Sequence, residues 1–247
     1  MNVCVTVDVE DWYDGMAELG HALPAPASSS SGLAALRLIL ADTSAARVTL
    51  FVVGKYCAEW ADDLRALAAD GHEVASHGPD HGVPPQEAGP LQDWLRRGRE
   101  MTEDVIQHPV TGFRSPCFRI PAVGLEGYRD VLAEAGYGYV SDRHLLGGRT
   151  PVKELPVLRW RRLPLGGGSY QRLLPKTVVS AALEHQAGPT VLYYHSYDFG
   201  VSLPSPLSTR SPAVLKQVIG RGRISDVVRH VLRRAGSVTC SEVANGV

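Results

Sequence analysis

The alternation of strand patterns with helix patterns constrains the fold of this chain more than any other sequence feature. Runs rich in valine and aromatic residues alternate with amphipathic segments rich in alanine and leucine. The expected strands are residues 3–7, 47–53, 73–76, 137–140 and 190–195, and the expected helices are residues 33–40, 58–70, 90–106, 125–135 and 176–185. This alternation predicts an α/β fold, with helices around a parallel sheet that is open or closed into a barrel. No repeat or linker divides the chain, so we expect a single domain over residues 1–247.

Polar side chains stand at the ends of four separate strand segments. They are the acidic cluster Asp8, Glu10 and Asp11, the pair His77 and His81, and the single residues Arg114 and His195. Because the carboxyl ends of parallel strands meet on one face of such a fold, we expect these side chains to be neighbours. The sequence therefore predicts one site that is assembled from distant parts of the chain.

The two histidines are four residues apart, and residues with this spacing face the same way over one turn of helix. Gly78 and Pro79 lie between them and favour a loop that runs into a first helical turn, where proline loses no hydrogen bond. Two imidazole nitrogens that face the same way are suited to bind one metal ion. His77 and His81 are therefore candidate metal ligands.

Composition excludes several classes of function. With 25 basic and 26 acidic residues the net charge is −1, which does not favour nucleic-acid binding, and a solvated helix face explains the arginines near the C-terminus. The four cysteines are far apart in sequence and indicate neither a cysteine zinc site nor a disulfide framework. No apolar run reaches the ~20 residues that span a bilayer, so we expect no membrane span. The chain begins in a strand without a secretory signal, so we expect a cytoplasmic protein.

Five stretches are informative because of their order along the chain. They are residues 8–12 (Asp-Val-Glu-Asp-Trp), 76–81, 114–118, 163–175 and 192–195. Together they resemble the motifs of the polysaccharide deacetylases of carbohydrate esterase family 4, and residues 163–175 are similar to a segment of the subgroup with the Asp-Val-Glu-Asp-Trp first motif. The resemblance implies a distorted (β/α) barrel of about seven units, a variant of the eight-unit barrel.

Members of this family bind one divalent metal ion through a carboxylate and two histidines, which implies His77 and His81 as ligands here. The first motif supplies both the carboxylate ligand and a catalytic base. Asp8 and Glu10 alternate along the strand and share one face, so we prefer Asp8 as the base and Glu10 as the ligand. If the chain has already turned at Glu10, Asp11 is the ligand instead. Zinc is the expected ion, and cobalt, nickel and manganese also suit these ligands.

The other motifs imply the remaining roles. Arg114 would pair with the base and keep it ionised, since a guanidinium forks onto a carboxylate and lowers its pKa. His195 would be the general acid that protonates the departing amine. Pro116, Leu192 and Tyr194 would line the substrate pocket, with Leu192 against the acetyl methyl group and Tyr194 able to stack on a sugar ring.

The function that the resemblance implies is a metal-dependent N-deacetylase, a hydrolase of carbon–nitrogen bonds other than peptide bonds. The expected substrate is an N-acetylated amino sugar or glycoside, such as a cytosolic biosynthetic intermediate. Two alternatives stay open: a metal-free hydrolase of a small or cyclic amide, and a non-catalytic carbohydrate-binding relative.

Two departures from the family pattern concern the walls of the site. The fourth motif of the family carries an aspartate that orients the catalytic histidine and a tryptophan that lines the acetyl pocket. In this chain the aspartate is displaced to Asp142 and no tryptophan stands beside it. Residues 196–198 (Ser-Tyr-Asp) replace the Pro-Trp-Glu that follows the last histidine in the subgroup. These changes affect substrate choice more than the metal chemistry.

Overall fold

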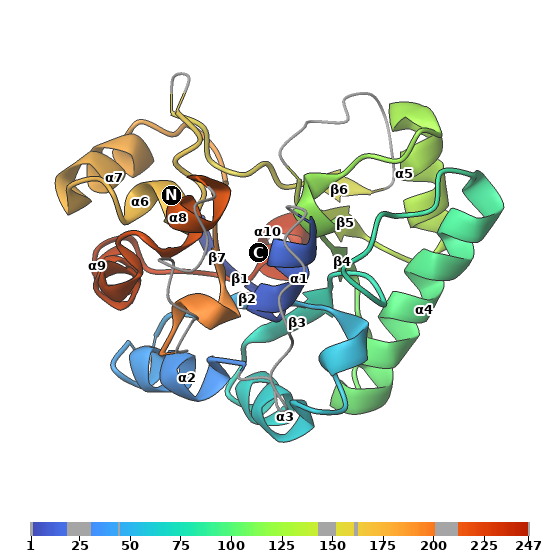
Figure 1. Cartoon of the computed structure of the whole chain (residues 1–247), viewed down its shortest axis with the longest axis horizontal. Helices are drawn as coiled ribbons and strands as arrows, with labels where there is room; N and C mark the ends of the chain where they lie inside the picture. The colour runs from blue at the N-terminus through green and yellow to red at the C-terminus, as the bar shows by residue number, and fades with distance from the viewer. Residues whose placement is uncertain are drawn as a thin grey trace.

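A curled parallel sheet lies at the centre of the computed structural model, which describes residues 2–18, 31–43, 45–142, 152–160, 163–200 and 212–246 (Figure 1). Within these residues the sheet has seven strands in the order β6-β5-β4-β3-β2-β1-β7. The strands are β1 (Val3–Val9), β2 (Thr49–Val52), β3 (Glu73–Ser76), β4 (Gly112–Phe113), β5 (Tyr139–Val140), β6 (Lys153–Glu154) and β7 (Thr190–His195). The first strand is therefore second from one edge, and it pairs with β2 on one side and β7 on the other.

Most helices surround the outer face of the sheet, whereas the first and the last lie inside this ring in the view of Figure 1. In chain order they are α1 (Trp12–Glu18), α2 (Leu33–Ala41), α3 (Ala61–Ala69), α4 (Ala88–Ile106), α5 (Gly124–Glu134), α6 (Gly168–Gln171), α7 (Lys176–Glu184), α8 (Pro212–Val218), α9 (Ile224–Ala235) and α10 (Cys240–Asn245). Short 3-10 turns are η1 (Gly54–Tyr56), η2 (Pro116–Phe118), η3 (Ser196–Asp198) and η5 (Arg221–Arg223). None of the helices in the described part of the chain is long and apolar enough to cross a membrane.

The sheet curls until the segment after β6 meets β7. Val157 forms a parallel bridge with Val191, and the Leu158 amide donates to the Val191 carbonyl at 2.9 Å. This contact brings the two edges of the sheet together, so the predicted distorted (β/α) barrel is confirmed. The barrel is distorted because the segment that follows β6 makes this contact in place of β6.

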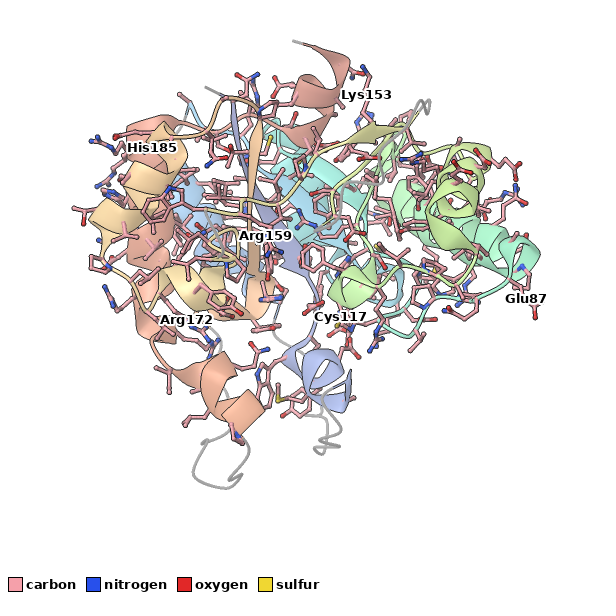
Figure 2. All side chains as sticks on the ribbon, turned by 90° about the horizontal axis from the view of Figure 1, so that it is seen from above. Glu87, Cys117, Lys153, Arg159, Arg172 and His185 are labelled. Carbon is pink, nitrogen blue, oxygen red and sulfur yellow. The ribbon has the colours of Figure 1, made fainter. Side chains whose placement is uncertain are left out.

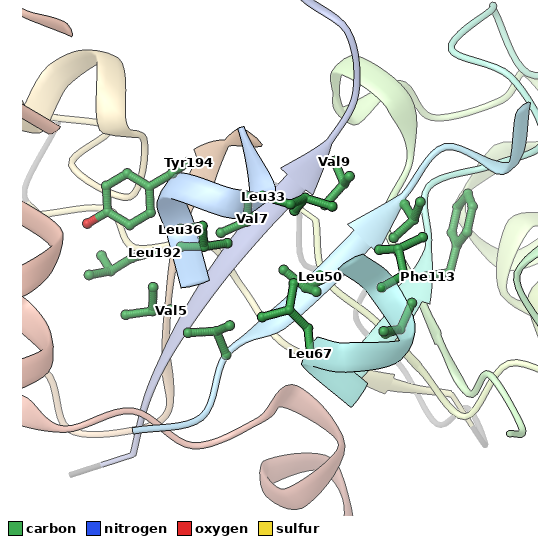
Figure 3. Close-up of a cluster of buried hydrophobic side chains, with 14 of the residues drawn as sticks. Val5, Val7, Val9, Leu33, Leu36, Leu50, Leu67, Phe113, Leu192 and Tyr194 are labelled. Atoms are coloured by element: carbon green, nitrogen blue, oxygen red, sulfur yellow. The ribbon is translucent and has the colours of Figure 1, made fainter. Parts of the chain in front are cut away.

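Side chains of β1 alternate between two buried layers, as the period of two in a strand requires. Val3, Val5, Val7 and Val9 belong to the large apolar cluster that contains side chains of α2 and α3, and Figure 3 shows part of this outer layer. Cys4 belongs to a second cluster inside the curl of the sheet, with Phe51, Tyr193 and other residues. Polar side chains at the inner positions of β1 are therefore held inside the barrel.

The last helix closes the end of the barrel where the strands begin. The Cys240 amide donates to Thr49 Oγ1 at 2.9 Å, and the Ser241 amide donates to Glu73 Oε2 at 3.0 Å. Thr49 and Glu73 are the first residues of β2 and β3. In Figure 2, Lys153 at the start of β6 lies near this end, and α1 lies at the opposite end together with Cys117 and Arg172. The carboxyl ends of the strands therefore remain available for a site.

The strands and helices predicted from the sequence are observed with small shifts at their ends, but one local prediction is wrong and one helix was not predicted. The chain after β3 forms an irregular loop around His77 and His81 in place of the expected helical turn. Gly78 has a φ of 83° there, and a side chain on it would lie 2.4 Å from the Trp94 ring, so this loop requires glycine at Gly78. Residues 12–18, for which the sequence predicted no element, form α1 with Trp12 and Met16 buried.

Candidate active site

The strand register brings the sequence-predicted polar residues to one end of the barrel. Asp8 lies opposite His195 in the pairing of β1 with β7, and opposite Phe51 in the pairing of β1 with β2. Further along the sheet, Ser76 pairs with Phe113, so the residues that follow β3 and β4 are also adjacent. The expected convergence of the four strand ends is therefore present.

Arg114 is fully buried inside the barrel and is hydrogen-bonded on each side of its guanidinium. Nη1 donates to Asp8 Oδ1 at 2.6 Å and to Thr6 Oγ1 at 2.8 Å. Nε and Nη2 donate to the carbonyl and hydroxyl of Ser141 at 3.3 and 2.8 Å. The Phe51 ring lies 4.1 Å from the guanidinium carbon, a distance typical of a cation–π contact. Asp8 is therefore held in one position with its charge compensated.

Glu10 forms a buried cluster with the two histidines. Glu10 Oε2 lies 2.6 Å from His81 Nε2 and 3.5 Å from His77 Nε2, and among the described residues these three form a group whose ligand atoms lie within 4.8 Å of one another. Ligands about 2 Å from one zinc ion are on the order of 3 Å apart, so the donor set fits a divalent cation. Burial alone would raise the pKa of the Glu10 carboxyl, but His81 and His77 lower it well below its usual value.

The tautomer of His77 supports the same conclusion. His77 Nδ1 lies 2.8 Å from the carbonyl oxygen of Arg114, a group that only accepts hydrogen bonds. Nδ1 therefore carries the proton, which leaves the lone pair on Nε2, the atom that faces Glu10. This backbone contact is of the kind that orients histidine ligands of metal ions. The same contact connects His77, a candidate metal ligand, to Arg114, which binds Asp8.

Asp11 takes part in a different local structure. Its Oδ1 accepts a hydrogen bond from the Tyr13 amide at 2.9 Å, beside the start of α1. Burial raises the pKa of the Asp11 carboxyl. The chain thus turns after Glu10, and the acid that faces the histidines is Glu10.

His195 lies on the other side of Glu10. Its Nε2 is 3.8 Å from Glu10 Oε1, and its ring stacks on Tyr197 with a centroid separation of 4.8 Å and an interplanar angle of 5°. Burial alone would lower the pKa of His195, but Asp198, Glu10 and Asp8 raise it to about 9. A cationic His195 is able to donate a proton from Nε2 to a group bound near Glu10.

The three residues expected to line the substrate pocket lie in different parts of the structure. Pro116 is buried and begins η2, two residues after Arg114. Leu192 and Tyr194 lie in the outer layer (Figure 3), where the Tyr194 hydroxyl donates to Gln171 Oε1 at 2.6 Å. That face is opposite to His195, so this position gives Leu192 and Tyr194 no direct access to the site. The inner side chain of this strand is Tyr193, whose ring centroid lies 5.9 Å from that of His195.

Several residues of the site were missed by the sequence reasoning. Thr6 and Ser141 bind Arg114, and Asp198 lies beside His195. Thr6 could have been found, because it lies two positions before Asp8 and so shares its face. Tyr193 could have been found by the same rule, counted back from His195.

This geometry defines a curled α/β barrel with a buried carboxylate–histidine cluster at the carboxyl ends of its strands, and known proteins share the fold. Residues 34–140 match the sequence profile of the family "Polysaccharide deacetylase", and residues 137–245 match that of a "Domain of unknown function (DUF3473)". No curated protein matches the chain. The chain is therefore similar to polysaccharide deacetylases in sequence over residues 34–140, and the structures below are similar to it in fold.

Three solved structures illustrate the similarity of fold. A putative polysaccharide deacetylase from Mycobacterium smegmatis is 21% identical, with a TM-score of 0.68 over 100% of this chain and 89% of that one. A family 4 acetyl xylan esterase from Clostridium thermocellum, solved with a cobalt ion, is 13% identical, with a TM-score of 0.56 over 99% and 91% of the two chains. A family 4 pseudoenzyme from Bacillus anthracis is 12% identical, with a TM-score of 0.56 over 98% and 65%.

Proposed function

We propose that this protein is a metal-dependent amide hydrolase that removes an N-acetyl group from an amino-sugar-containing substrate. The observation that carries the proposal is the arrangement around Glu10. Its Oε2 faces His77 and His81, its Oε1 faces His195, and Asp8 lies opposite His195 on the neighbouring strand. A nucleophile-activating base and a proton donor thus flank one candidate metal centre.

The candidate metal centre consists of Glu10, His77 and His81. Imidazole and carboxylate ligands suit zinc, which we expect first, and also cobalt, nickel and manganese. When bound, a divalent cation supplies Lewis acidity toward a water molecule and toward the amide carbonyl. The buried carboxylate of Glu10 and the fixed tautomer of His77 provide the charge and the lone pair that such an ion needs.

The chain's own residues would move the protons. Asp8 would accept a proton from the attacking water, and Arg114 would hold the Asp8 carboxylate in position through their 2.6 Å contact. His195 would then donate a proton from Nε2 to the leaving nitrogen. An amide nitrogen needs this proton to depart, whereas the alkoxide of an ester needs it less, so a proton donor at this place favours amide substrates.

The class of substrate is proposed from the matching family profile and from one structural neighbour. The matching profile is that of polysaccharide deacetylases, and the neighbour from Clostridium thermocellum is an acetyl xylan esterase, so both concern acetylated carbohydrates. We also propose that the chain acts as one catalytic unit, because β1 and β7, which are far apart in the sequence, pair directly and both supply residues of the site.

The test is the release of acetate from N-acetylated chito-oligosaccharides by the wild type and by Asp8→Asn. Because Asp8 acts on water and not on the ion, Asp8→Asn should keep its metal content and lose about 100- to 10,000-fold in turnover. Asp63→Asn, which removes a carboxylate from an exposed ion pair with Arg37, is the matched control and should retain full activity. Undiminished acetate release by Asp8→Asn would contradict the proposal, and sugar binding without release by the wild type would favour a carbohydrate-binding protein.

A further inference from the structure

Asp198 lies beside the candidate general acid and makes contacts on both of its oxygens. Oδ2 accepts a hydrogen bond from the His195 amide at 3.1 Å and lies 3.6 Å from His195 Nδ1. The second distance is a few tenths of an ångström longer than a hydrogen bond, and catalytic pairs are often this loose before a substrate binds. The carboxylate therefore faces the edge of the ring that is remote from Glu10.

Two arginines hold the other oxygen of this carboxylate. Asp198 Oδ1 lies 3.2 Å from Arg172 Nη1 and 3.6 Å from Arg221 Nε. Asp198 and Arg172 are both almost fully buried, so this ion pair is shielded from water. The Arg172 carbonyl in turn accepts a hydrogen bond from Arg223 Nη1 at 2.9 Å. The carboxylate is thereby fixed in place independently of the histidine.

Arg172 belongs to residues 163–175, the stretch of the sequence that the proposed chemistry does not otherwise use. Its neighbour Gln171 accepts from the Tyr194 hydroxyl at 2.6 Å and donates to the Leu165 carbonyl at 2.8 Å. These bonds fasten α6 to the outer face of β7 just before His195. This stretch therefore places the buried guanidinium of Arg172 beside Asp198.

The stacking of His195 on Tyr197 makes the position of Asp198 important. A parallel stack at 4.8 Å fixes the plane of the imidazole ring, but it does not decide which edge of the ring faces Glu10. A rotation of the ring by 180° about its Cβ–Cγ bond would keep the same plane but exchange nitrogen and carbon on both edges. A carboxylate beside Nδ1 opposes this half-turn, because it would then face a carbon in place of an N–H donor.

We propose that Asp198, held by Arg172 and Arg221, is the positioning residue of His195. It keeps Nδ1–H on its own side and so directs Nε2 toward the reaction centre. In this chain Asp198, three residues after the histidine, would do what an aspartate of the fourth motif does elsewhere in the family. Asp142, the candidate for that motif, follows β5 and accepts a hydrogen bond from the Val157 amide through its carbonyl at 3.2 Å. The proposal rests on the proposed function of His195 as general acid.

The kinetic test compares Asp198→Asn, Asp198→Glu, Asp142→Asn and His195→Ala on two substrates, an N-acetylated chito-oligosaccharide and an activated aryl acetate. Asp198→Asn keeps the size of the side chain and should lower kcat for the amide by at least about 10-fold, as loss of an orienting partner does, with KM little changed. Its kcat for the aryl acetate, whose leaving group needs no proton, should fall much less. Asp198→Glu should restore part of the amide activity, and Asp142→Asn should leave the ratio of the two activities unchanged.

A spectroscopic measurement tests the positioning without using activity. In 15N-labelled protein the Nδ1–H proton of His195, assigned by its absence in His195→Gln, should resonate downfield in the wild type and move upfield in Asp198→Asn. If this signal moves as expected but no variant affects amide turnover, the proposed function of His195 fails and the positioning by Asp198 stands.

Three results would overturn the positioning role. The first is an unchanged Nδ1–H signal in folded Asp198→Asn. The second is that Asp198→Asn loses equal activity on both substrates and has a lower thermal midpoint. The third is a selective loss of amide turnover in Asp142→Asn and not in Asp198→Asn. The second result would mean that Asp198 serves only to neutralise the buried arginines. The third result would mean that Asp142, the candidate for the fourth motif, positions His195.

Discussion

Replacing Arg114 by methionine should lower the free energy of unfolding by about 3–5 kcal/mol, because it leaves the Asp8 carboxylate buried without its cation. Methionine preserves most of the apolar stem, so little of this loss comes from packing. The lost hydrogen bonds to Thr6 and Ser141 contribute as well, at about 1 kcal/mol each. The effect is large because the side chain of Arg114 is 0% exposed.

A double-mutant cycle separates the ion pair from these other contacts. Asp8→Asn keeps an oxygen that can accept from Arg114 and removes the charge, so we expect a smaller loss, on the order of 1–3 kcal/mol. In the double variant no charge is left buried, and its loss should be smaller than the sum of the two single losses by about 2 kcal/mol. The surface pair of Arg37 and Asp63 is the control, and its cycle should give less than about 1 kcal/mol.

The assay is urea unfolding followed by far-ultraviolet circular dichroism, in the presence of a chelator so that metal binding does not add to stability. The reasoning is refuted if the losses of Arg114→Met and Asp8→Asn add up within about 0.5 kcal/mol, the scatter expected for independent sites. Additive losses would mean that the buried contact does not couple the two charges.

Two further predictions concern His195 and Glu73. His195→Ala should reduce hydrolysis of an N-acetyl amino sugar about 100- to 10,000-fold and hydrolysis of an activated acetyl ester far less, and its metal content should be unchanged. Equal losses on both substrates would show that His195 shapes the pocket and does not donate a proton. Burial raises the pKa of Glu73, so its folded form binds a proton more tightly than the unfolded chain, where the pKa is about 4.5. Its contribution to stability is therefore complete below about pH 4.5 and is lost as the pH rises through the folded pKa. The stability of the wild type minus that of Glu73→Gln should accordingly fall between pH 4.5 and pH 7, and a rise over this range would contradict the assignment.

Much of the fold could be predicted because strand and helix periods are clear in the sequence. The alternation of valines with polar residues in β1 places Asp8 on the inner face, and it also explains why Glu10, two residues later, points the same way. Strand β7 has no such contrast. Tyr193 and Tyr194 are both aromatic, so the pattern does not mark which one faces the site, and the structure places Leu192 and Tyr194 in the outer layer.

Loop geometry and the short helix α1 could not be predicted, because tertiary contacts decide them. The loop that carries His77 and His81 owes its shape to Gly78 against the Trp94 ring, a contact between residues 16 positions apart. The helix α1 contains Gly15 and begins with Trp12, so its local propensity is weak, and the burial of Trp12 and Met16 stabilises it. Asp198 became visible only once η3 was known to fold its carboxylate back onto His195.

The measurement that tests the central claim most directly is the metal content of purified, untagged protein together with its release of acetate, for the wild type, Glu10→Gln and Asp11→Asn. The wild type should hold one equivalent of a divalent metal and lose activity when a chelator removes it. Glu10→Gln should lose both metal and acetate release, because it removes the charged member of a three-ligand set, whereas Asp11→Asn should retain both. Full acetate release by Glu10→Gln, or by the wild type after complete removal of metal, would contradict the account.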